Sequence, residues 1–317
     1  MKEKSISIIV PVYNEHENVP IILDRIINEI SELKYQFTLL FVDDGSDDKV
    51  LSFLTTSNTS GHINVEVLTL TRNFGHQAAL AAGLNHGAFD AYISMDGDLQ
   101  HPPSLLKDLI YSWENGNQVV QTLRISELKQ KFLKKIFSDV FYKFFRIGSS
   151  FEIKSGSSDF RLLDRKVVNV INSIPERTKV LRALLPVLGF KTAYIKFIAE
   201  TRFKGTSKYS IKKMIKLAYL SFLSYSRIPI YAALFISFTL ILSTVVFSVF
   251  ILYERIFLNI YVPGQASILL TNLFTSFVVL ISQSLIFIHV RKIHDQLQGI
   301  PPYVIDSSVT INAKGNE

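Results

Sequence analysis

The sequence predicts an α/β domain with a mainly parallel sheet, followed by a region anchored in a membrane. Two features of the first half predict the sheet: short continuous apolar runs alternate with segments of helical periodicity, and each run stops abruptly at polar residues. Two long uncharged stretches near the C-terminus predict the membrane region. The 317 residues include no cysteine, which excludes disulfides, thiolate metal sites and thiol nucleophiles.

Continuous apolar runs predict the strands, and helical periodicity predicts helices between them. Strands are expected at Ser5–Tyr13, Phe37–Val42, Val65–Leu70, Ala91–Met95 and Val119–Leu123. Helices are expected at Asn18–Leu33, His76–Asn85 and Pro103–Asn115. This alternation is typical of parallel strands covered by helices on both faces. Ligands of such sheets bind beyond the carboxyl ends of the strands.

Polar side chains stand at that edge, directly after each predicted strand. In chain order they are Tyr13 and Glu15, Asp43 and Asp44, Arg72 and Asn73, Asp96 and Asp98, and Arg124. Each group alone is equally well explained by a turn or a helix cap. Acidic and basic side chains that converge on one edge from every predicted strand indicate a binding site instead.

Asp96 and Asp98 are the candidates for a metal site within this edge. They leave the fourth strand on the same side, because side chains alternate along a strand. Two carboxylates at this spacing suit a divalent cation that also takes oxygens from a diphosphate, although an isolated Asp-Gly-Asp is more often a turn. The chain has no Gly-x-Gly-x-x-Gly after the first strand and no Walker sequence, which favours a nucleotide-sugar over NAD or ATP.

The second half of the chain predicts contact with a membrane. Basic and aromatic residues alternate between Glu127 and Ile147, which favours a membrane-surface helix over an ordinary solvated one. The segment from Arg202 to Lys216 contains cations and no acid, and predicts a second interfacial helix. Ile228–Tyr253 and Ser267–Ile288 carry no charge and are long enough to span a hydrocarbon core of about 30 Å. That length disfavours the alternative of two buried core helices.

The net charge of +7 suggests anionic partners such as nucleic acid, phospholipid or a phosphorylated substrate. Because the cations cluster beside the uncharged stretches, we expect a lipid bilayer as partner and no nucleic acid. The positive-inside rule predicts a multi-pass protein of the inner cell membrane with the N-terminal domain and both termini cytoplasmic. The expected parts are a cytoplasmic domain at 1–200, a basic interfacial helix at 201–227, two transmembrane helices at 228–290, and a cytoplasmic tail at 291–317 whose last ten residues are disordered.

Several motifs resemble the inverting family 2 glycosyltransferases of GT-A (Rossmann-like) fold. They are Pro11-Val12-Tyr13-Asn14-Glu15, Asp43-Asp44-Gly45-Ser46, Thr71-Arg72-Asn73-Phe74-Gly75-His76-Gln77 and Asp96-Gly97-Asp98-Leu99-Gln100-His101-Pro102. Further motifs resemble, more narrowly, the polyprenyl-phosphate glycosyltransferases, which include the bactoprenol glucosyltransferases and dolichol-phosphate mannose synthase. They are Ser158-Asp159-Phe160-Arg161-Leu162-Leu163, Arg202-x-x-Gly205-x-Ser207-Lys208-Tyr209 and Gly299-x-Pro301-Pro302-Tyr303.

The resemblance implies a role for each site residue. The donor nucleotide is expected to contact Pro11, Tyr13, Glu15, Asp43, Asp44 and Asp96. Mg²⁺ or Mn²⁺ is expected between Asp96, Asp98 and Gln100. Phosphates of donor and acceptor are expected at Arg124, Arg202 and Lys208. The catalytic residues are expected to be Asp159, Arg202 and Lys208.

Asp159 is expected either to act as a base or only to position a substrate. A phosphomonoester acceptor is already largely ionised at neutral pH, so a strong base is hardly needed. The sequence departs from the family where Glu127 stands in place of a frequent arginine, which puts an acceptor-phosphate contact in question, and where Ala183 stands in place of a frequent glycine.

The resemblance implies transfer of a sugar, with inversion, from a nucleotide-sugar donor to polyprenyl (undecaprenyl) phosphate on the cytoplasmic leaflet. Glucose from UDP-glucose is the first choice, and GDP-mannose, UDP-galactose and UDP-N-acetylhexosamines are alternatives. A processive polysaccharide synthase is less favoured because Gln-x-x-Arg-Trp is missing, and a non-enzymatic accessory subunit is a further alternative. Polar residues along the second uncharged stretch suit self-association, hypothetically as a tetramer.

Overall fold

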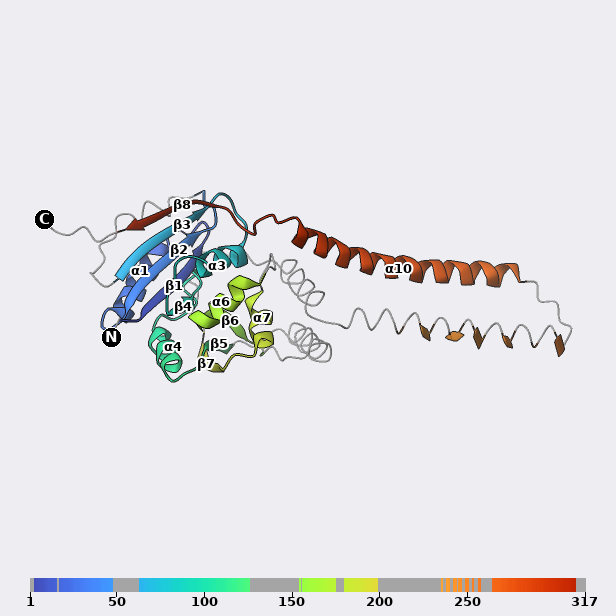
Figure 1. Cartoon of the computed structure of the whole chain (residues 1–317), viewed down its shortest axis with the longest axis horizontal. Coiled ribbons are helices and arrows are strands. Elements are labelled where there is room, and N and C mark those ends of the chain that lie inside the picture. Colours follow the sequence, from blue (N-terminus) through green and yellow to red (C-terminus); the bar gives the residue numbers. More distant parts are fainter. Residues whose placement is uncertain are drawn as a thin grey trace. The chain divides into compact units, whose positions relative to one another are not determined.

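The structure is a computed structural model that describes residues 3–15, 17–47, 63–125, 156–174, 180–198 and 264–311, with position 154 and isolated positions between 235 and 257. The chain divides into two compact units. One unit contains the sheet and includes the chain from Pro301 onward, and the other contains the long helix α10 (Gln265–Leu297). Figure 1 shows the elements of both units.

Eight strands of the described residues form a single sheet, in the order β7-β5-β6-β4-β1-β2-β3-β8. Strands β6 and β8 run opposite to the rest. The strands are β1 (Ser5–Val12), β2 (Gln36–Asp43), β3 (Ile63–Leu70), β4 (Ala91–Ser94), β5 (Val119–Ile125), β6 (Ser157–Asp164), β7 (Thr192–Ile198) and β8 (Ile305–Ile311). The sheet is therefore mainly parallel, as the sequence predicts.

Helices cover both faces of this sheet (Figure 1). One face packs against α1 (Val19–Ile30) and α4 (Leu105–Glu114), and the other against α3 (His76–Leu84), α6 (Arg165–Ser173) and α7 (Leu181–Leu188). In β1, Ile8 packs in the first layer and the adjacent Ile9 in the second, and both are fully buried. Burial on both faces explains why the central strands are continuous apolar runs.

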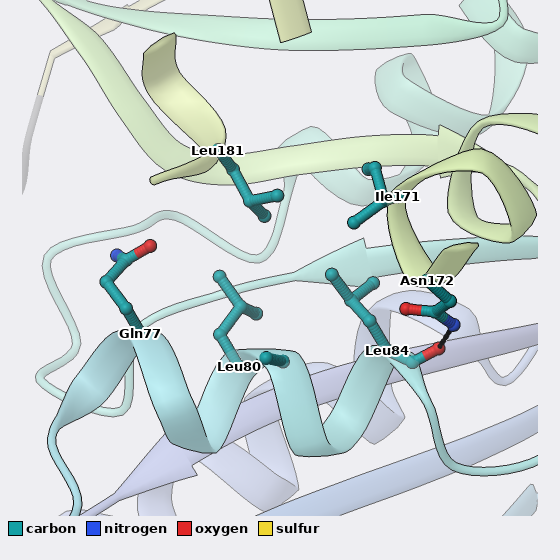
Figure 2. Close-up of a pocket in the computed structure, with 7 residues that line it drawn as sticks. Gln77, Leu80, Leu84, Ile171, Asn172 and Leu181 are labelled. Carbon is teal, nitrogen blue, oxygen red and sulfur yellow. Dashed lines mark hydrogen bonds between the residues drawn. The ribbon is translucent and has the colours of Figure 1, made fainter. Parts of the chain in front are cut away.

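The pocket in Figure 2 lies in the second layer, where α3 faces α6 and α7. Leu80 and Leu84 of α3 point toward Ile171 and Leu181. Gln77, one turn nearer the start of α3, lines the same pocket. This packing fixes the beginning of α3, which carries site residues described below.

The five strands and three helices predicted between Ser5 and Leu123 are all present, with ends shifted by a few residues. Strand β6, which was not among the predicted strands, begins at Ser157 and pairs with both β4 and β5. The expectation of ten disordered C-terminal residues is wrong as far as Ile311. These residues belong to β8, which pairs with β3. This pairing provides hydrogen-bond partners for the backbone groups on the outer edge of β3.

One helix within the described residues, over Phe274–Asp295, is long and apolar enough to cross a membrane, with a mean hydropathy of 1.5. It belongs to α10, which continues beyond the predicted end at Ile288 because no helix breaker precedes Gly299. Most of the first predicted span, Ile228–Tyr253, lies outside the described residues. The predicted surface helices at Glu127–Ile147 and Arg202–Lys216 lie outside them entirely.

Polar residues of α10 were expected to face another helix. The hydroxyls of Thr271, Thr275 and Ser284 instead donate to carbonyls one turn earlier in α10, over 2.8–2.9 Å. Such bonds satisfy a hydroxyl within its own helix. These side chains therefore do not require a partner, and self-association stays a prediction.

Candidate active site

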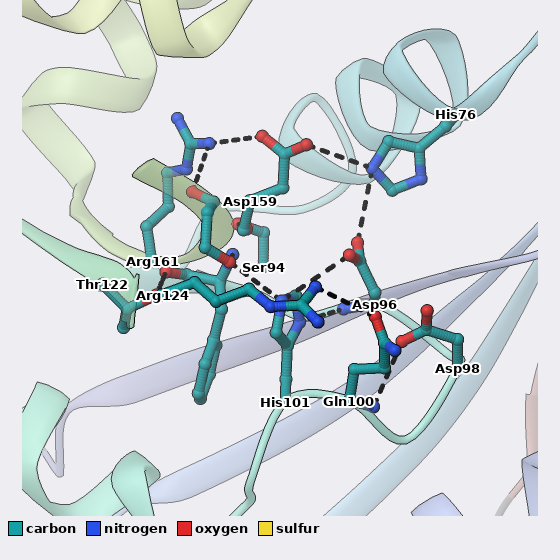
Figure 3. Close-up of polar contacts among 12 residues, drawn as sticks. His76, Ser94, Asp96, Asp98, Gln100, His101, Thr122, Arg124, Asp159 and Arg161 are labelled. Atoms are coloured by element: carbon teal, nitrogen blue, oxygen red, sulfur yellow. Dashed lines mark hydrogen bonds and ion pairs between the residues drawn. The ribbon is translucent and has the colours of Figure 1, made fainter. Parts of the chain in front are cut away.

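The site residues gather at one edge of the sheet because of the strand directions. The carboxyl ends of β1, β2, β3, β4, β5 and β7 meet at this edge. The antiparallel strand β6 begins at the same edge, so Asp159 lies near the residues that follow β4. Figure 3 shows the resulting network of polar contacts.

The loops after β1 and β2 are tied together by hydrogen bonds. The Asn14 amide donates to Ser46 Oγ over 2.9 Å, and the Asp47 amide donates to Asn14 Oδ1 over 3.0 Å. The Ser46 amide also donates to Asp43 Oδ1 over 3.0 Å. Tyr13 lies in this loop region, next to Asn14.

Asp44 links this region to the loop before α3. Its two carboxylate oxygens accept the amide hydrogens of Phe74 and Gly75, over 2.7 and 2.9 Å. Burial raises the pKa of Asp44 above its ordinary value, although the two amide donors act in the opposite direction. Gly45 permits the close approach of the loops, because a Cβ there would lie 2.5 Å from the carbonyl carbon of Arg72.

The residues after β4 form a tight turn from Asp96 to Gln100. Asp98 Oδ1 accepts the Gln100 amide over 3.2 Å, and Leu99 adopts a φ of 61°, which is rare outside glycine. The Gln100 side-chain oxygen accepts from Arg124 Nη1 of β5 over 3.2 Å. The turn thus carries both acidic side chains and is connected to the arginine that follows the fifth predicted strand (Figure 3).

His76, the first residue of α3, lies between the two acidic parts of the site. Its Nε2 is 3.4 Å from Asp96 Oδ1 and 3.7 Å from Asp159 Oδ2 (Figure 3). Burial alone would lower the pKa of His76, but the Asp159 and Asp96 carboxylates outweigh it and raise the pKa to about 9. The imidazole is therefore a cation at neutral pH and connects the two carboxylates.

Asp159 is buried and surrounded by cations. Arg161, which is fully buried, bonds to Asp159 Oδ1, and Arg182 binds both carboxylate oxygens over 3.2 and 2.9 Å. Gln77 Nε2 contacts Asp159 Oδ2 over 3.4 Å. Burial alone would raise the pKa of Asp159, but the arginines outweigh it and hold the pKa well below its ordinary value. Asp159 is thus a permanent anion and a weak base.

His101 lies beneath the Asp96 turn and is also buried. Its Nδ1 accepts the Asp96 amide over 3.0 Å, and its Nε2 is 2.8 Å from Ser158 Oγ. Burial lowers the pKa of His101, despite the nearby Asp96, Asp98 and Asp159 carboxylates, which act in the opposite direction. His101 is therefore neutral where His76 is charged.

Comparison with known proteins shows the family of this chain. The family model for glycosyl transferase family 2 matches residues 7–171, which run from within β1 to within α6 and include every described carboxylate of the site. This chain belongs to glycosyl transferase family 2.

Its relatives match over nearly their full length. An uncharacterized glycosyltransferase of Synechocystis is 31% identical over 95% of this chain and 94% of its own. The bactoprenol glucosyl transferase of Shigella phage SfX is 32% identical over 95% of this chain and 99% of its own. A prophage-derived bactoprenol glucosyl transferase of Shigella flexneri is 31% identical over 96% and 98%. The resemblance to bactoprenol glucosyltransferases drawn from the motifs is thereby confirmed.

Among solved structures, glucosyl-3-phosphoglycerate synthase of Mycobacterium tuberculosis aligns with 69% of this chain and 78% of its own. The identity is 16% and the TM-score is 0.49.

The structure brings together five of the site residues predicted for this glycosyltransferase. Asp96, Asp98, Gln100, Arg124 and Asp159 form one contact network through the two histidines. Their predicted roles stay predictions.

The remaining predicted residues are placed differently. Glu15 Oε2 accepts from Asn18 over 2.5 Å, at the start of α1. Pro11 is buried within β1, and its carbonyl would lie 3.2 Å from a Cβ on Gly97. Pro11 therefore supports the Asp96 turn through its backbone. Arg202 and Lys208 lie outside the described residues.

Sequence reasoning gave no role to four residues of this network, which are His76, His101, Arg161 and Arg182. The first three stand inside motifs that carry the family resemblance, which was the available signal. Arg182 has no such signal, because α7 reaches Asp159 only through the fold.

Proposed function

We propose that this glycosyltransferase moves a hexose from a nucleotide-sugar to a polyprenyl phosphate at the cytoplasmic surface of a membrane, with inversion at the anomeric carbon. Relatives named bactoprenol glucosyl transferase, similar over almost the whole chain, support the lipid acceptor. The long apolar helix at Phe274–Asp295 supports attachment to a bilayer. A prenyl chain in the bilayer would hold its phosphate at headgroup level, next to a domain tethered there.

The observation that carries the proposal is the single imidazole that contacts both Asp96 and Asp159. His76 Nε2 lies within 3.7 Å of each carboxylate, so the predicted metal site and the predicted catalytic aspartate are parts of one site. A transferase needs this closeness, since the leaving diphosphate and the attacking group flank one carbon atom.

The donor set after β4 fits Mg²⁺ or Mn²⁺. Among the described residues, no three His, Asp or Glu side chains are grouped to hold a metal ion by themselves. Mg²⁺ is usually bound by one or two carboxylates and completed by substrate phosphates and water. Asp96 and Asp98, with the Gln100 oxygen beside them, match that pattern of hard oxygen ligands. When bound, the cation would neutralise the charge that develops on the leaving diphosphate.

Asp159 acts in this proposal as a fixed anion. Its ion pairs with Arg161 and Arg182 keep it ionised and weakly basic, so it does not remove a proton in the reaction. The acceptor phosphate is already an anion at neutral pH. One of its oxygens attacks the anomeric carbon, the bond from that carbon to the diphosphate oxygen breaks, and the nucleoside diphosphate leaves with the electron pair.

The remaining groups bind and orient. Arg124 donates a hydrogen bond to Gln100 in the Asp96 turn. Its guanidinium group is proposed to hold a donor phosphate through two hydrogen bonds. Arg202 and Lys208 are proposed to hold the acceptor phosphate, on the strength of the motif alone. UDP-glucose is the proposed donor, because the bactoprenol relatives are named as glucosyl transferases.

Lipid-linked sugar formation tests the proposal directly. Membranes containing the protein are incubated with undecaprenyl phosphate and one of four labelled donors: UDP-glucose, GDP-mannose, UDP-galactose or UDP-N-acetylglucosamine. We expect label from UDP-glucose in the lipid fraction, its loss with EDTA, and recovery with Mg²⁺ or Mn²⁺. Membranes containing the Asp98→Ala variant are the control. Label in lipid that persists under full chelation would contradict the metal role, and no lipid product from any donor would contradict the function.

A further inference from the structure

His101 occupies a closed space between the Asp96 turn and the start of β6. Its side chain is almost fully buried, with 6% of the residue exposed. The imidazole stacks on Phe160, with ring centres 5.1 Å apart and planes at 21°, and it meets the edge of Phe197 at 5.8 Å. These rings fix the plane of the imidazole, so both of its nitrogens have set directions.

Each nitrogen has a hydrogen-bond partner, and Nε2 also lies 3.6 Å from Asp96 Oδ2. The Asp96 amide can only donate, so Nδ1 must accept and carry no proton, at a distance of 3.0 Å. The ring proton is then on Nε2, which donates to Ser158 Oγ over 2.8 Å. His101 is thus a rigid bridge from the backbone of Asp96 to the residue that precedes Asp159.

The Asp96 turn needs an anchor of this kind. Leu99 holds a positive φ of 61°, a conformation that is unfavourable for a residue with a side chain. On the β1 side the turn is already in contact, since a Cβ on Gly97 would lie 3.1 Å from Val12 Cγ1. The contact with β1 prevents the turn from moving toward β1, but it does not prevent movement away from it. The His101 bridge holds it from the other side.

We propose that His101 is a positioning residue for the metal ligands: it fixes the Asp96 turn to β6 and thereby sets the separation between the metal site and Asp159. The proposal rests on the metal role of Asp96 and Asp98 proposed above. A second bond supports the same junction, because Ser94 Oγ at the end of β4 donates to the Asp159 carbonyl over 2.5 Å. Outer partners of metal ligands are known to govern metal affinity in this way.

The test uses two variants that each remove the hydrogen bond between His101 and Ser158, one by changing Ser158 and one by changing His101. Ser158→Ala removes the acceptor for His101 and keeps the imidazole, and His101→Asn keeps an acceptor for the Asp96 amide but does not reach Ser158. Mn²⁺ affinity is measured with UDP present, by electron paramagnetic resonance of free Mn²⁺, on the full chain in detergent. We expect each variant to bind Mn²⁺ about tenfold more weakly, and the double variant no more weakly than either single one.

The control is His86→Asn. His86 contacts Glu66 at 2.8 Å on another part of the domain and should leave Mn²⁺ affinity unchanged. Thermal unfolding midpoints of all variants separate a loss of packing from a loss of metal affinity.

Three results would overturn the proposal. Single variants that bind Mn²⁺ within about twofold of the wild type would remove the positioning role and leave the metal site intact. Effects that multiply in the double variant would show that the two residues act separately. Wild-type protein that binds no Mn²⁺ would remove the metal role of the proposed function, and this proposal with it.

Discussion

Asp96 and Asp159 lie at one edge of the sheet and share the His76 imidazole, but their surroundings differ. Asp96 stands on a turn that is held through its backbone by the neutral His101. Asp159 is held through its carboxylate by the guanidinium groups of Arg161 and Arg182. Within the part of the chain that the structure describes, only imidazole nitrogens approach the Asp96 carboxylate, at 3.4 and 3.6 Å, whereas the Asp159 carboxylate forms ion pairs with two guanidinium groups and serves as a fixed charge. The two surroundings therefore indicate two different tasks.

The largest loss of stability is expected from a substitution that removes the buried guanidinium group of Arg161, the partner of Asp159. Arg161→Met removes the fully buried cation that pairs with Asp159, so we expect a loss of roughly 3–5 kcal/mol in the free energy of unfolding. Thermal unfolding of the detergent-purified protein measures the effect.

Arg182→Met is the matched variant, because the Arg182 side chain is 44% exposed and water replaces part of what it supplies. The unfolding midpoint of Arg182→Met should fall by clearly less than that of Arg161→Met. Equal midpoints for the wild type and Arg161→Met would show that the buried ion pair does not hold the Asp159 side together.

A smaller loss of stability is expected for a substitution at Gly45, where the loops after β2 and β3 meet through their backbones. Gly45→Ala places a Cβ 2.5 Å from the Arg72 carbonyl carbon at a φ of 68°, so the loops after β2 and β3 must separate. We expect a loss of about 2–3 kcal/mol in stability and a higher KM for the nucleotide-sugar. Unfolding midpoints and initial rates at varied donor concentration measure the two effects.

Gly189→Ala is the control for backbone conformation, because Gly189 has a similar φ of 69° but nothing within 4 Å of an added Cβ. It should lose only about 1–2 kcal/mol and leave the donor KM unchanged. A KM raised equally by both variants would contradict the role given to the Gly45 contact.

The strands also differ in how well the sequence predicts them. β1, β2 and β4 are largely apolar, and β3 and β5 combine apolar residues with a few polar ones, so the pattern that predicts each strand is local in the sequence. β6 carries the buried Asp159 and Arg161 within the strand, which interrupts the apolar pattern. β8 is largely exposed, and its pairing with β3 joins residues as far apart as Glu66 and Thr310. No local pattern marks such a pairing.

The site divides in the same way. Asp96, Asp98 and Arg124 were predictable because each follows a strand of a parallel sheet. The cations around Asp159 come from α3, β6 and α7, and meet only because β6 inserts between β4 and β5 in the opposite direction. The position of His101 depends on the same insertion, since its partner Ser158 lies at the start of β6.

The most direct test of the two tasks compares Asp98→Asn with Asp159→Asn, which each remove one negative charge without changing side-chain size. Mn²⁺ affinity with UDP present and the rate of sugar transfer are measured on the same preparations of the full chain. We predict that Asp98→Asn weakens Mn²⁺ binding about tenfold or more, and that Asp159→Asn slows transfer while Mn²⁺ affinity stays within about threefold of the wild type. Equal loss of Mn²⁺ affinity in the two variants, or unchanged affinity in Asp98→Asn, would contradict the account.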